Sequence, residues 1–428
     1  FNPANGAWEE HPELSFVART RRNIDILGFD PDDENLLLVA DNQGSNLTYI
    51  RDYNLSSRQF GETLFAHPRW EAAGVLLDNV DGSPENTRIV GFTYQAGAEE
   101  PYWVDAAMEA LHTRLRSALG TQYVRIGARF GEHRIIVASD SRTPPTYYLL
   151  TNETTLSPLG SSNPLVDPST LRRTELIFYT ARDGLQVPGF LTLPLGWTPA
   201  DGPLPTIVQP HGGPWSRNTN DWGGSDIGVA QYFASRGFAV LEPQFRGSTG
   251  FGDQLWKAGD QQWGLAMQDD KDDGLAYLVR EGIADPDRAM LYGFSYGGFA
   301  AIAASVRPNS PYRCAISGAG VSSVARIAND WGDNRIQRRF QGWTVDGLDP
   351  LENAANINIP LLMYHGDRDQ TAEMWHSDRF YAATRNAASP VRYEVIRDMP
   401  HGAITADMRS RELSVVEDFM RGTCGISF

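Results

Sequence analysis

Residues 289–305 read AMLYGFSYGGFAAIAAS, and this stretch decides the fold. It joins an apolar strand, 289–292, to an apolar helix, 296–306, through the turn Gly293-Phe-Ser-Tyr-Gly297. A serine in a G-x-S-x-G turn between a strand and a helix is typical of the nucleophile elbow of α/β-hydrolases, where the crowded turn requires small neighbours. An ordinary glycine-rich turn is the alternative. We therefore predict that Ser295 is a nucleophile on a parallel α/β sheet.

The rest of the C-terminal region, 169–428, alternates apolar strands with helical stretches. This alternation is typical of a parallel sheet that helices cover on both faces. A hairpin, 175–181 with 186–193, is expected at its start. The other expected strands are 206–209, 238–241, 289–292, 315–317, 361–364 and 393–396, and the expected helices are 272–281, 296–306 and 408–420.

The N-terminal region, 1–168, shows short strands separated by turns. Three of them, 36–41, 88–94 and 135–140, recur at a period of about 50 residues, which is typical of a β-propeller. A generic β-sandwich is the alternative. The predicted fold class is therefore α/β, with an α/β-hydrolase domain at 169–428 preceded by an all-β partial β-propeller domain at 1–168.

The number of propeller blades in residues 1–168 bears on the partners of the chain. That length accommodates three to four blades at a period of about 50 residues. So few blades struggle to close a ring, and open sheet edges favour association. The chain also starts at Phe1 rather than Met. We expect a missing propeller fragment, a homo-oligomer, or both.

A serine nucleophile needs a base and an orienting acid, which follow it in the order Ser, Asp, His in this fold. Asp369 lies just past an expected strand, and His401 lies in a Pro/Gly loop before the final helix. Asp367 is a rival for the acid, because it follows the same strand. His376 is a rival for the base, but it comes early and falls in an expected helix, where a solvated side chain is the simpler interpretation.

The tetrahedral intermediate needs two backbone N–H donors. The first is expected from Tyr296, directly after the nucleophile, and the second from a loop after an earlier strand. The segment His211-Gly-Gly-Pro214 follows strand 206–209, and we predict Gly213 as that donor. A plain turn is the alternative for this loop. For His211 itself we expect a structural hydrogen-bonding role.

Charge and composition exclude several classes of partner. The net charge is −16, from 37 basic and 53 acidic residues, which argues against nucleic acid and anionic membranes as partners. No apolar run approaches the roughly 18 residues of a membrane span. The sequence lacks a phosphate-binding loop and a dinucleotide fingerprint, and His365-Gly-Asp-Arg-Asp369 lacks a second cluster at metal-ligand spacing. We expect no metal and no cofactor.

The two cysteines, Cys314 and Cys424, are too few for a disulfide framework. Cys314 lies in an apolar run and is expected to be a buried core thiol. One bridge between the two is possible, but the sequence does not determine it. A cytoplasmic location and a periplasmic or secreted one therefore both stay open.

The C-terminal region resembles the prolyl oligopeptidase family of serine peptidases, most of all its acylaminoacyl-peptidase and dipeptidyl-peptidase-like branch. In the family's H-G-x-x-D pattern the last position is the catalytic acid, so the resemblance selects Asp369 over Asp367. It also implies a seven- or eight-bladed propeller before the hydrolase, of which residues 1–168 would be about half. The matching segments are 211–214, 245–252, 282–286, 293–298, 365–369 and 400–402.

The sequence departs from that family after the acid. Many relatives carry Arg-Val-Pro there, and the arginine can bind a substrate carbonyl, whereas this chain has Thr371-Ala-Glu373. A substrate pocket is expected from a nearby aromatic and basic segment, with plain packing or surface as the alternative. Its candidate residues are Trp331, Arg335, Arg338, Phe340 and Trp343.

The resemblance implies a serine exopeptidase or oligopeptidase that cleaves short peptides through an acyl-enzyme, with the propeller restricting access. A carboxylesterase of the same fold is the alternative, because both enzymes form the same acyl-serine. A non-catalytic, propeller-type interaction protein is a third hypothesis, and the complete set of Ser, His and Asp with an oxyanion loop argues against it.

Overall fold

The structure is a computed structural model that describes residues 6–14, 21–79, 86–222, 227–329 and 341–427. The chain divides into two compact units. Unit 1 comprises Phe1–Pro164 together with Gly250–Asp253, and unit 2 comprises Leu165–Thr249 and Gln254–Phe428. No helix in the described ranges is long and apolar enough to cross a membrane.

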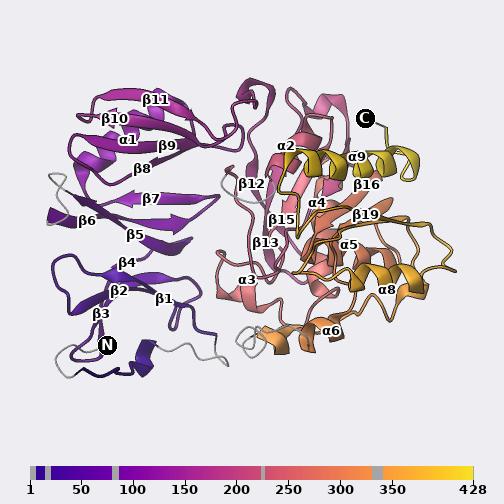
Figure 1. The fold of residues 1–428 in the computed structure, drawn as a ribbon, viewed down its shortest axis with the longest axis horizontal. Coiled ribbons are helices and arrows are strands. Elements are labelled where there is room, and N and C mark those ends of the chain that lie inside the picture. The colour runs from indigo at the N-terminus through magenta and orange to yellow at the C-terminus, as the bar shows by residue number, and fades with distance from the viewer. Residues whose placement is uncertain (1–5, 15–20, 80–85, 223–226, 330–340, 428) are drawn as a thin grey trace. The chain divides into compact units, whose positions relative to one another are not determined.

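Unit 1 is built from antiparallel sheets, which Figure 1 shows in indigo to purple. The strands expected from the sequence are central ones: β2 pairs with β1 and β3, β6 with β5 and β7, and β9 with β8 and β10. The strands of the described residues are β1 (Ile24–Phe29), β2 (Leu36–Asp41), β3 (Tyr49–Asn54), β4 (Gln59–Phe65), β5 (Glu71–Asn79), β6 (Thr87–Gln95), β7 (Glu99–Trp103), β8 (Tyr123–Ile126), β9 (His133–Ser139), β10 (Thr146–Thr151) and β11 (Thr155–Ser161).

A helix that the sequence analysis did not anticipate, α1 (Ala106–Leu119), follows β7. The Asp105 carboxylate caps its N-terminus by accepting from two backbone N–H groups, and Gly120 ends it at a φ of 64°. The helix buries Met108, Leu111 and Leu115 against unit 1. The repeat of strands had led us to expect β-structure throughout this region.

Unit 2 contains one large sheet in the order β12-β13-β15-β14-β16-β17-β18-β19, in which β12 and β13 form the predicted antiparallel hairpin and β14 to β19 are parallel. Its strands are β12 (Glu175–Thr180), β13 (Gln186–Thr192), β14 (Leu204–Val208), β15 (Ala239–Pro243), β16 (Ala284–Phe294), β17 (Cys314–Gly318), β18 (Leu361–Gly366) and β19 (Val391–Ile396).

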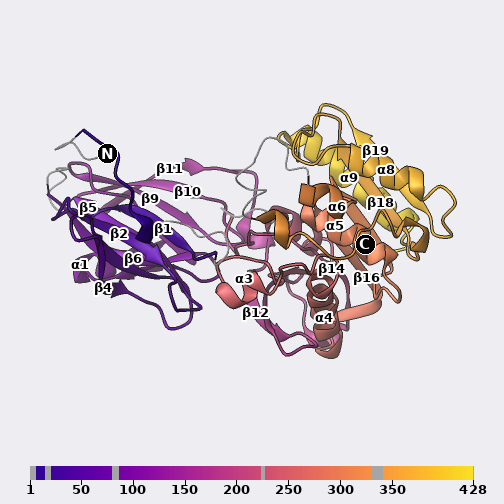
Figure 2. The ribbon, with the colours of Figure 1, turned by 90° about the horizontal axis from the view of Figure 1, so that it is seen from below.

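Helices pack on both faces of this sheet (Figure 2). Alternate residues of each strand point to opposite faces. Leu291 and Leu361 therefore face α4, α5 and α8, whereas Met290 and Leu362 face α2 and α9. The helices of the described residues after β11 are α2 (Ile227–Ala234), α3 (Asp253–Lys257), α4 (Ala266–Arg280), α5 (Tyr296–Val306), α6 (Val324–Asn329), α8 (Trp375–Ala383) and α9 (Ala406–Gly422). Short 3-10 turns lie at Pro12–Leu14 in unit 1 and at Pro168–Thr170, Pro199–Asp201, Gly342–Thr344 and Ala354–Asn356 in unit 2.

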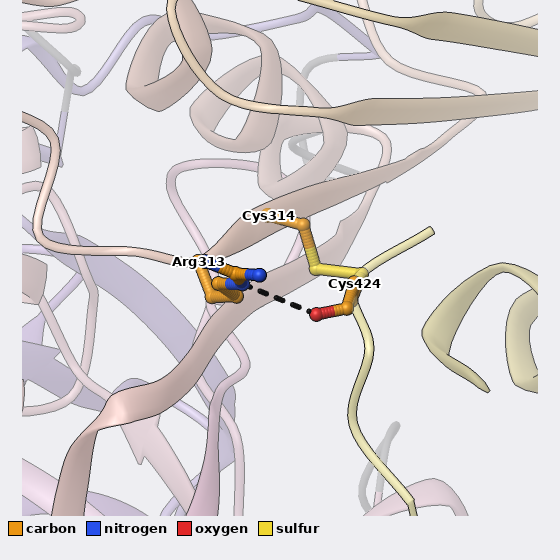
Figure 3. Close-up of a disulfide and its surroundings, with 3 residues drawn as sticks. All are labelled: Arg313, Cys314 and Cys424. Carbon is orange, nitrogen blue, oxygen red and sulfur yellow. Dashed lines mark hydrogen bonds between the residues drawn. A yellow bond between two sulfur atoms is a disulfide. The ribbon is translucent and has the colours of Figure 1, made fainter. Parts of the chain in front are cut away.

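A disulfide joins Cys314, at the start of β17, to Cys424, just after α9 (Figure 3). The two Cα atoms lie 5.7 Å apart and the cysteines are 110 residues apart in the chain. Arg313 Nε donates to the Cys424 carbonyl at 3.2 Å. The bridge that the sequence left open thus fastens the end of the chain to the middle of the sheet.

Candidate active site

Ser295 occupies the sharp turn between β16 and α5. Its backbone has φ 58° and ψ −117°, a conformation that residues with side chains adopt only under constraint. A Cβ on Gly297 would lie 2.3 Å from the Pro210 carbonyl oxygen, and one on Gly293 would lie 2.4 Å from the Gly297 carbonyl carbon. The glycines therefore permit backbone contacts that no other residue allows, as a nucleophile elbow requires.

Asp369 and His401 are brought together from separate loops. His401 Nδ1 lies 2.7 Å from Asp369 Oδ2, and because a carboxylate only accepts, Nδ1 carries the proton and Nε2 is left as a base. The backbone N–H groups of Thr371 and Ala372 donate to Asp369 Oδ1 at 2.8 and 2.9 Å. The Asp369 carboxylate is fully buried and held on both oxygens.

A second histidine, His365 on β18, also contacts this carboxylate. Its Nε2 lies 2.7 Å from the Ala372 carbonyl oxygen and 3.3 Å from Asp369 Oδ2, while its Nδ1 accepts from Ser377 Oγ at 2.8 Å. Burial by itself raises the pKa of the Asp369 carboxyl, but hydrogen bonds from His365 and His401 outweigh burial and hold that pKa well below its usual range. The sequence analysis used His365 only in a rejected metal cluster and as the first position of the H-G-x-x-D pattern, and assigned it no role beside the acid.

The two rival residues lie elsewhere. Asp367 accepts from the backbone N–H of Asp398 at 2.6 Å, and its side chain is 34% exposed. His376 lies in α8 and is buried, and its Nδ1 accepts from the backbone N–H of Ser322 at 3.2 Å. The expectation of a solvated His376 is therefore wrong, because the face of α8 that carries it packs inward.

The loop after β14 and the loop after β19 both reach the elbow. A Cβ on Gly212 would lie 3.4 Å from Ser295 Cβ, so this glycine packs directly against the predicted nucleophile. The His401 ring packs on Phe294, with ring centroids 5.1 Å apart. The first loop thus contacts Ser295 and the second contacts the neighbouring residue, Phe294.

His211 fixes the orientation of the glycine loop. Its Nδ1 donates to the Gly212 carbonyl oxygen at 2.7 Å, so the neutral ring accepts from Ser248 Oγ at Nε2, 2.8 Å away. Burial lowers the pKa of His211 to about 4, which keeps the ring neutral. Because N–H and C=O point in opposite directions across a trans peptide, the N–H of Gly213 points away from His211.

Comparison with known proteins identifies the unit that carries these residues. The profile of the prolyl oligopeptidase family matches residues 225–427. Unit 2 is therefore similar to this family over most of its length. The resemblance drawn from the sequence is thereby confirmed.

Relatives extend the similarity to both units. Dipeptidyl aminopeptidase BIII of Pseudoxanthomonas mexicana is 27% identical over 99% of this chain and 62% of that protein. A puromycin-hydrolyzing peptidase of Mycobacterium tuberculosis has a TM-score of 0.77 at 21% identity, covering 95% of this chain and 62% of that chain. An acylaminoacyl peptidase of Pyrococcus horikoshii has a TM-score of 0.62 at 19% identity, covering 91% of this chain and 62% of its own.

These structural neighbours confirm the predicted fold class, an α/β-hydrolase domain preceded by a partial β-propeller. The chain spans less than two thirds of the length of the proteins it matches, at 62% of each of these three.

Most of the predicted substrate pocket lies outside the described residues, namely Trp331, Arg335, Arg338 and Phe340. Trp343 is described: it lies in a 3-10 turn and is 47% exposed. In the segment that departs from the family pattern, Glu373 forms an ion pair with Arg326 at 2.6 Å. This segment is therefore tied to α6 through a carboxylate rather than carrying an arginine of its own.

Proposed function

We propose that this chain is the catalytic part of a serine peptidase that hydrolyses short peptides through an acyl-enzyme. The observation that carries the proposal is the elbow at Ser295, flanked by the Gly212 loop and by the paired side chains of His401 and Asp369. Residues 1–168 would form the propeller domain that restricts access, and residues 169–428 the catalytic domain.

The geometry supports a defined role for each group. His401 Nε2 takes the Ser295 hydroxyl proton as Oγ attacks the scissile carbonyl, and then gives that proton to the leaving amine. The backbone N–H groups of Tyr296, the first residue of α5, and of Gly213 are the proposed donors to the oxyanion. Water then attacks the acyl-serine by the same route, and Asp369 stabilises the imidazolium in both halves.

Relatives favour peptides over esters as substrates. The curated relative is a dipeptidyl aminopeptidase, and a structural neighbour hydrolyses puromycin. Comparing the turnover of aminoacyl and acylpeptide anilides with that of short-chain esters separates the peptidase from the carboxylesterase. We expect the higher kcat/KM on anilides, and a clear preference for esters would contradict the substrate class.

Covalent labelling tests the nucleophile. A fluorophosphonate probe should label the wild-type chain at Ser295, and Ser295→Ala should lose the label and at least about 10³-fold in turnover. The control is Ser305→Ala, on the same helix, whose hydroxyl donates to the Ile302 carbonyl and which should label normally. Labelling of Ser295→Ala at the wild-type rate would overturn the proposal.

We further propose that unit 1 is completed by additional blades or by a second copy of the chain. The edge strand β1 exposes Ile26 (53%) and Phe29 (59%), and apolar edge strands favour association. Native mass spectrometry should show a second polypeptide or an oligomer, and a lone monomer would contradict the proposed completion of unit 1.

The Cys314–Cys424 disulfide favours an oxidising compartment, periplasmic or secreted. Denaturing mass spectrometry without a reductant should show no free thiol, and two titratable thiols would contradict the disulfide and the compartment it favours.

A further inference from the structure

A buried lysine that has no part in the proposed mechanism lies behind the elbow. Lys271, on α4, has no exposed surface, and its Nζ donates to the Met267 carbonyl oxygen at 2.6 Å. The same Nζ lies 3.7 Å from the centroid of the Phe245 ring. Burial lowers the pKa of Lys271 to about 7, and the carboxylates of Asp270 and Asp272 oppose that fall. Burying an ammonium is costly, so a lysine in this position needs an explanation.

The Phe245 ring connects the two sides of the proposed oxyanion site. It stacks on the His211 ring, with centroids 4.5 Å apart, and on the Tyr296 ring, with centroids 5.2 Å apart. His211 holds the Gly212–Gly213 peptide, and Tyr296 carries the other proposed N–H donor. Both donors are therefore braced against one buried aromatic ring.

Helix α4 anchors this ring through two neighbouring side chains. Arg246, the residue after Phe245, donates from Nε and Nη2 to the Asp270 carboxylate at 2.9 and 2.7 Å. Lys271 is the next residue of the helix and covers the Phe245 ring itself. The attraction between a cation and an aromatic ring strengthens when both are removed from water, as they are here.

We propose that Lys271 is a positioning residue for the oxyanion site. Its ammonium holds the Phe245 ring, and that ring sets both Tyr296, whose N–H is one donor, and His211, which holds the peptide of the other donor, Gly213. The inference rests on the proposed function, because it assigns a role only if Ser295 is acylated. Donors that meet charge developing in the transition state affect kcat more than KM.

The first experiment replaces Lys271 by methionine, which has similar length but neither charge nor N–H donor. For the full chain, kcat and KM on a peptide anilide are measured per active site, counted with the fluorophosphonate probe. We expect kcat per site to fall about tenfold, less than the roughly 10²–10³-fold cost of losing a whole oxyanion donor, with KM unchanged. A merely structural lysine would lower the number of labelled sites and leave kcat per site intact, and that result would overturn the proposal.

The matched control is Asp273→Asn, two positions further along α4. Its carboxylate accepts from the Arg182 guanidinium and contacts neither Phe245 nor Lys271, so kcat per site should stay at the wild-type value. An equal loss of kcat in Asp273→Asn and Lys271→Met would show a general disturbance of α4 and overturn the specific role.

A double-mutant cycle tests the route through the ring. Phe245→Leu should lower kcat per site with KM unchanged, and adding Lys271→Met should cause little further loss. If the two losses multiply as independent effects do, the route through the ring is refuted.

If Lys271→Met does not fold, Phe245→Leu carries the test alone, and an unchanged kcat per site refutes the proposal. A wild-type chain that the probe does not label would overturn the proposed function, whereas a labelled wild type with full kcat in Lys271→Met would overturn this inference alone.

Discussion

Two buried carboxylates, one in each unit, show how differently the two regions use charge. Asp78, on β5 of unit 1, pairs with Arg134 of β9 at 2.5 and 2.8 Å, and Asp369 of unit 2 pairs with His401 at 2.7 Å. Burial raises the pKa of each carboxyl, but its hydrogen bonds lower that pKa by more. The net pKa of both carboxyls is therefore below the usual value.

The partners make the difference. Arginine stays protonated at any physiological pH, so the Asp78–Arg134 pair can only hold two sheets together. A neutral imidazole has one nitrogen that donates and one that accepts, so His401 can hold Asp369 through Nδ1 and accept a proton at Nε2. A buried carboxylate with a lowered pKa is therefore not by itself the sign of a functional site. The partner of the carboxylate must also be able to accept and release a proton.

The surrounding strands differ in the same sense. In unit 2 every residue of β17 and β18 is buried, because helices cover both faces of the sheet. In unit 1 most residues of β4 and β11 are exposed. The strands that support the candidate active site are therefore shielded from water in unit 2. In unit 1, where less of the strands is buried, ion pairs contribute to stability.

The largest expected effect comes from breaking the unit 2 pair. Asp369→Asn removes the charge that orients His401 and stabilises its imidazolium, and kcat should fall about 10⁴-fold. Steady-state kinetics on a peptide anilide measures the loss. Asp367→Asn, whose carboxylate faces the Asp398 N–H, should change kcat by no more than about twofold. If Asp367→Asn proves the more damaging variant, the acid has been misassigned.

Breaking the unit 1 pair should affect stability and leave the chemistry intact. Asp78→Ala leaves Arg134 buried with Glu153 as its remaining charged partner and the Gly127 carbonyl as an acceptor, and we expect unit 1 to lose about 3–5 kcal/mol of unfolding free energy. Hydrogen exchange read by mass spectrometry reports each unit separately. Glu9→Gln, at an exposed ion pair with Arg58, is the control and should cost less than about 1 kcal/mol. A tenfold drop in kcat per labelled site in Asp78→Ala would contradict this division of roles.

The smallest effect concerns pH. The pKa of His211 is lowered to about 4, so between about pH 6.5 and 4 the unfolded chain binds a proton that folded unit 2 does not. The contribution of neutral His211 to the unfolding free energy of unit 2 is therefore fully present above about pH 6.5. It is lost as the pH falls toward 4, by up to about 3 kcal/mol. His211→Asn keeps a donor for the Gly212 carbonyl but does not titrate, and should flatten this slope in unit 2.

Unit 1 supplies the internal reference for that measurement. Burial and Arg116 lower the pKa of His112, so unit 1 should keep its own acid sensitivity in the His211→Asn variant. Urea denaturation between pH 4 and 7, with pulsed hydrogen exchange to assign each transition to its unit, makes the comparison. An unchanged slope in unit 2 would mean that His211 is protonated in the folded chain.

The strands of unit 2 could be predicted because each is a continuous apolar run between polar turns. The structure reproduces expected strand 361–364 as β18 and expected helix 296–306 as α5. Helix α1 was missed because a repeat of strands was extended across it, although the spacing of Met108, Leu111 and Leu115 is helical. A repeat that is inferred from three strands describes the region as a whole, so it does not reveal a single helix inserted between two of them.

The elbow at Ser295 could be predicted from local patterning alone, because its strand, glycine turn and helix are contiguous in the chain. Local patterning did not separate Asp367 from Asp369, since the two positions lie in one turn, and a family resemblance had to select between them. Four contacts are visible only in the folded chain: Asp369 with His401, Asp369 with His365, Cys314 with Cys424, and Lys271 with Phe245. The His401, disulfide and Lys271 contacts join residues far apart in the chain, and all four depend on where strand ends and side chains point once the sheet is packed, which local propensity does not specify.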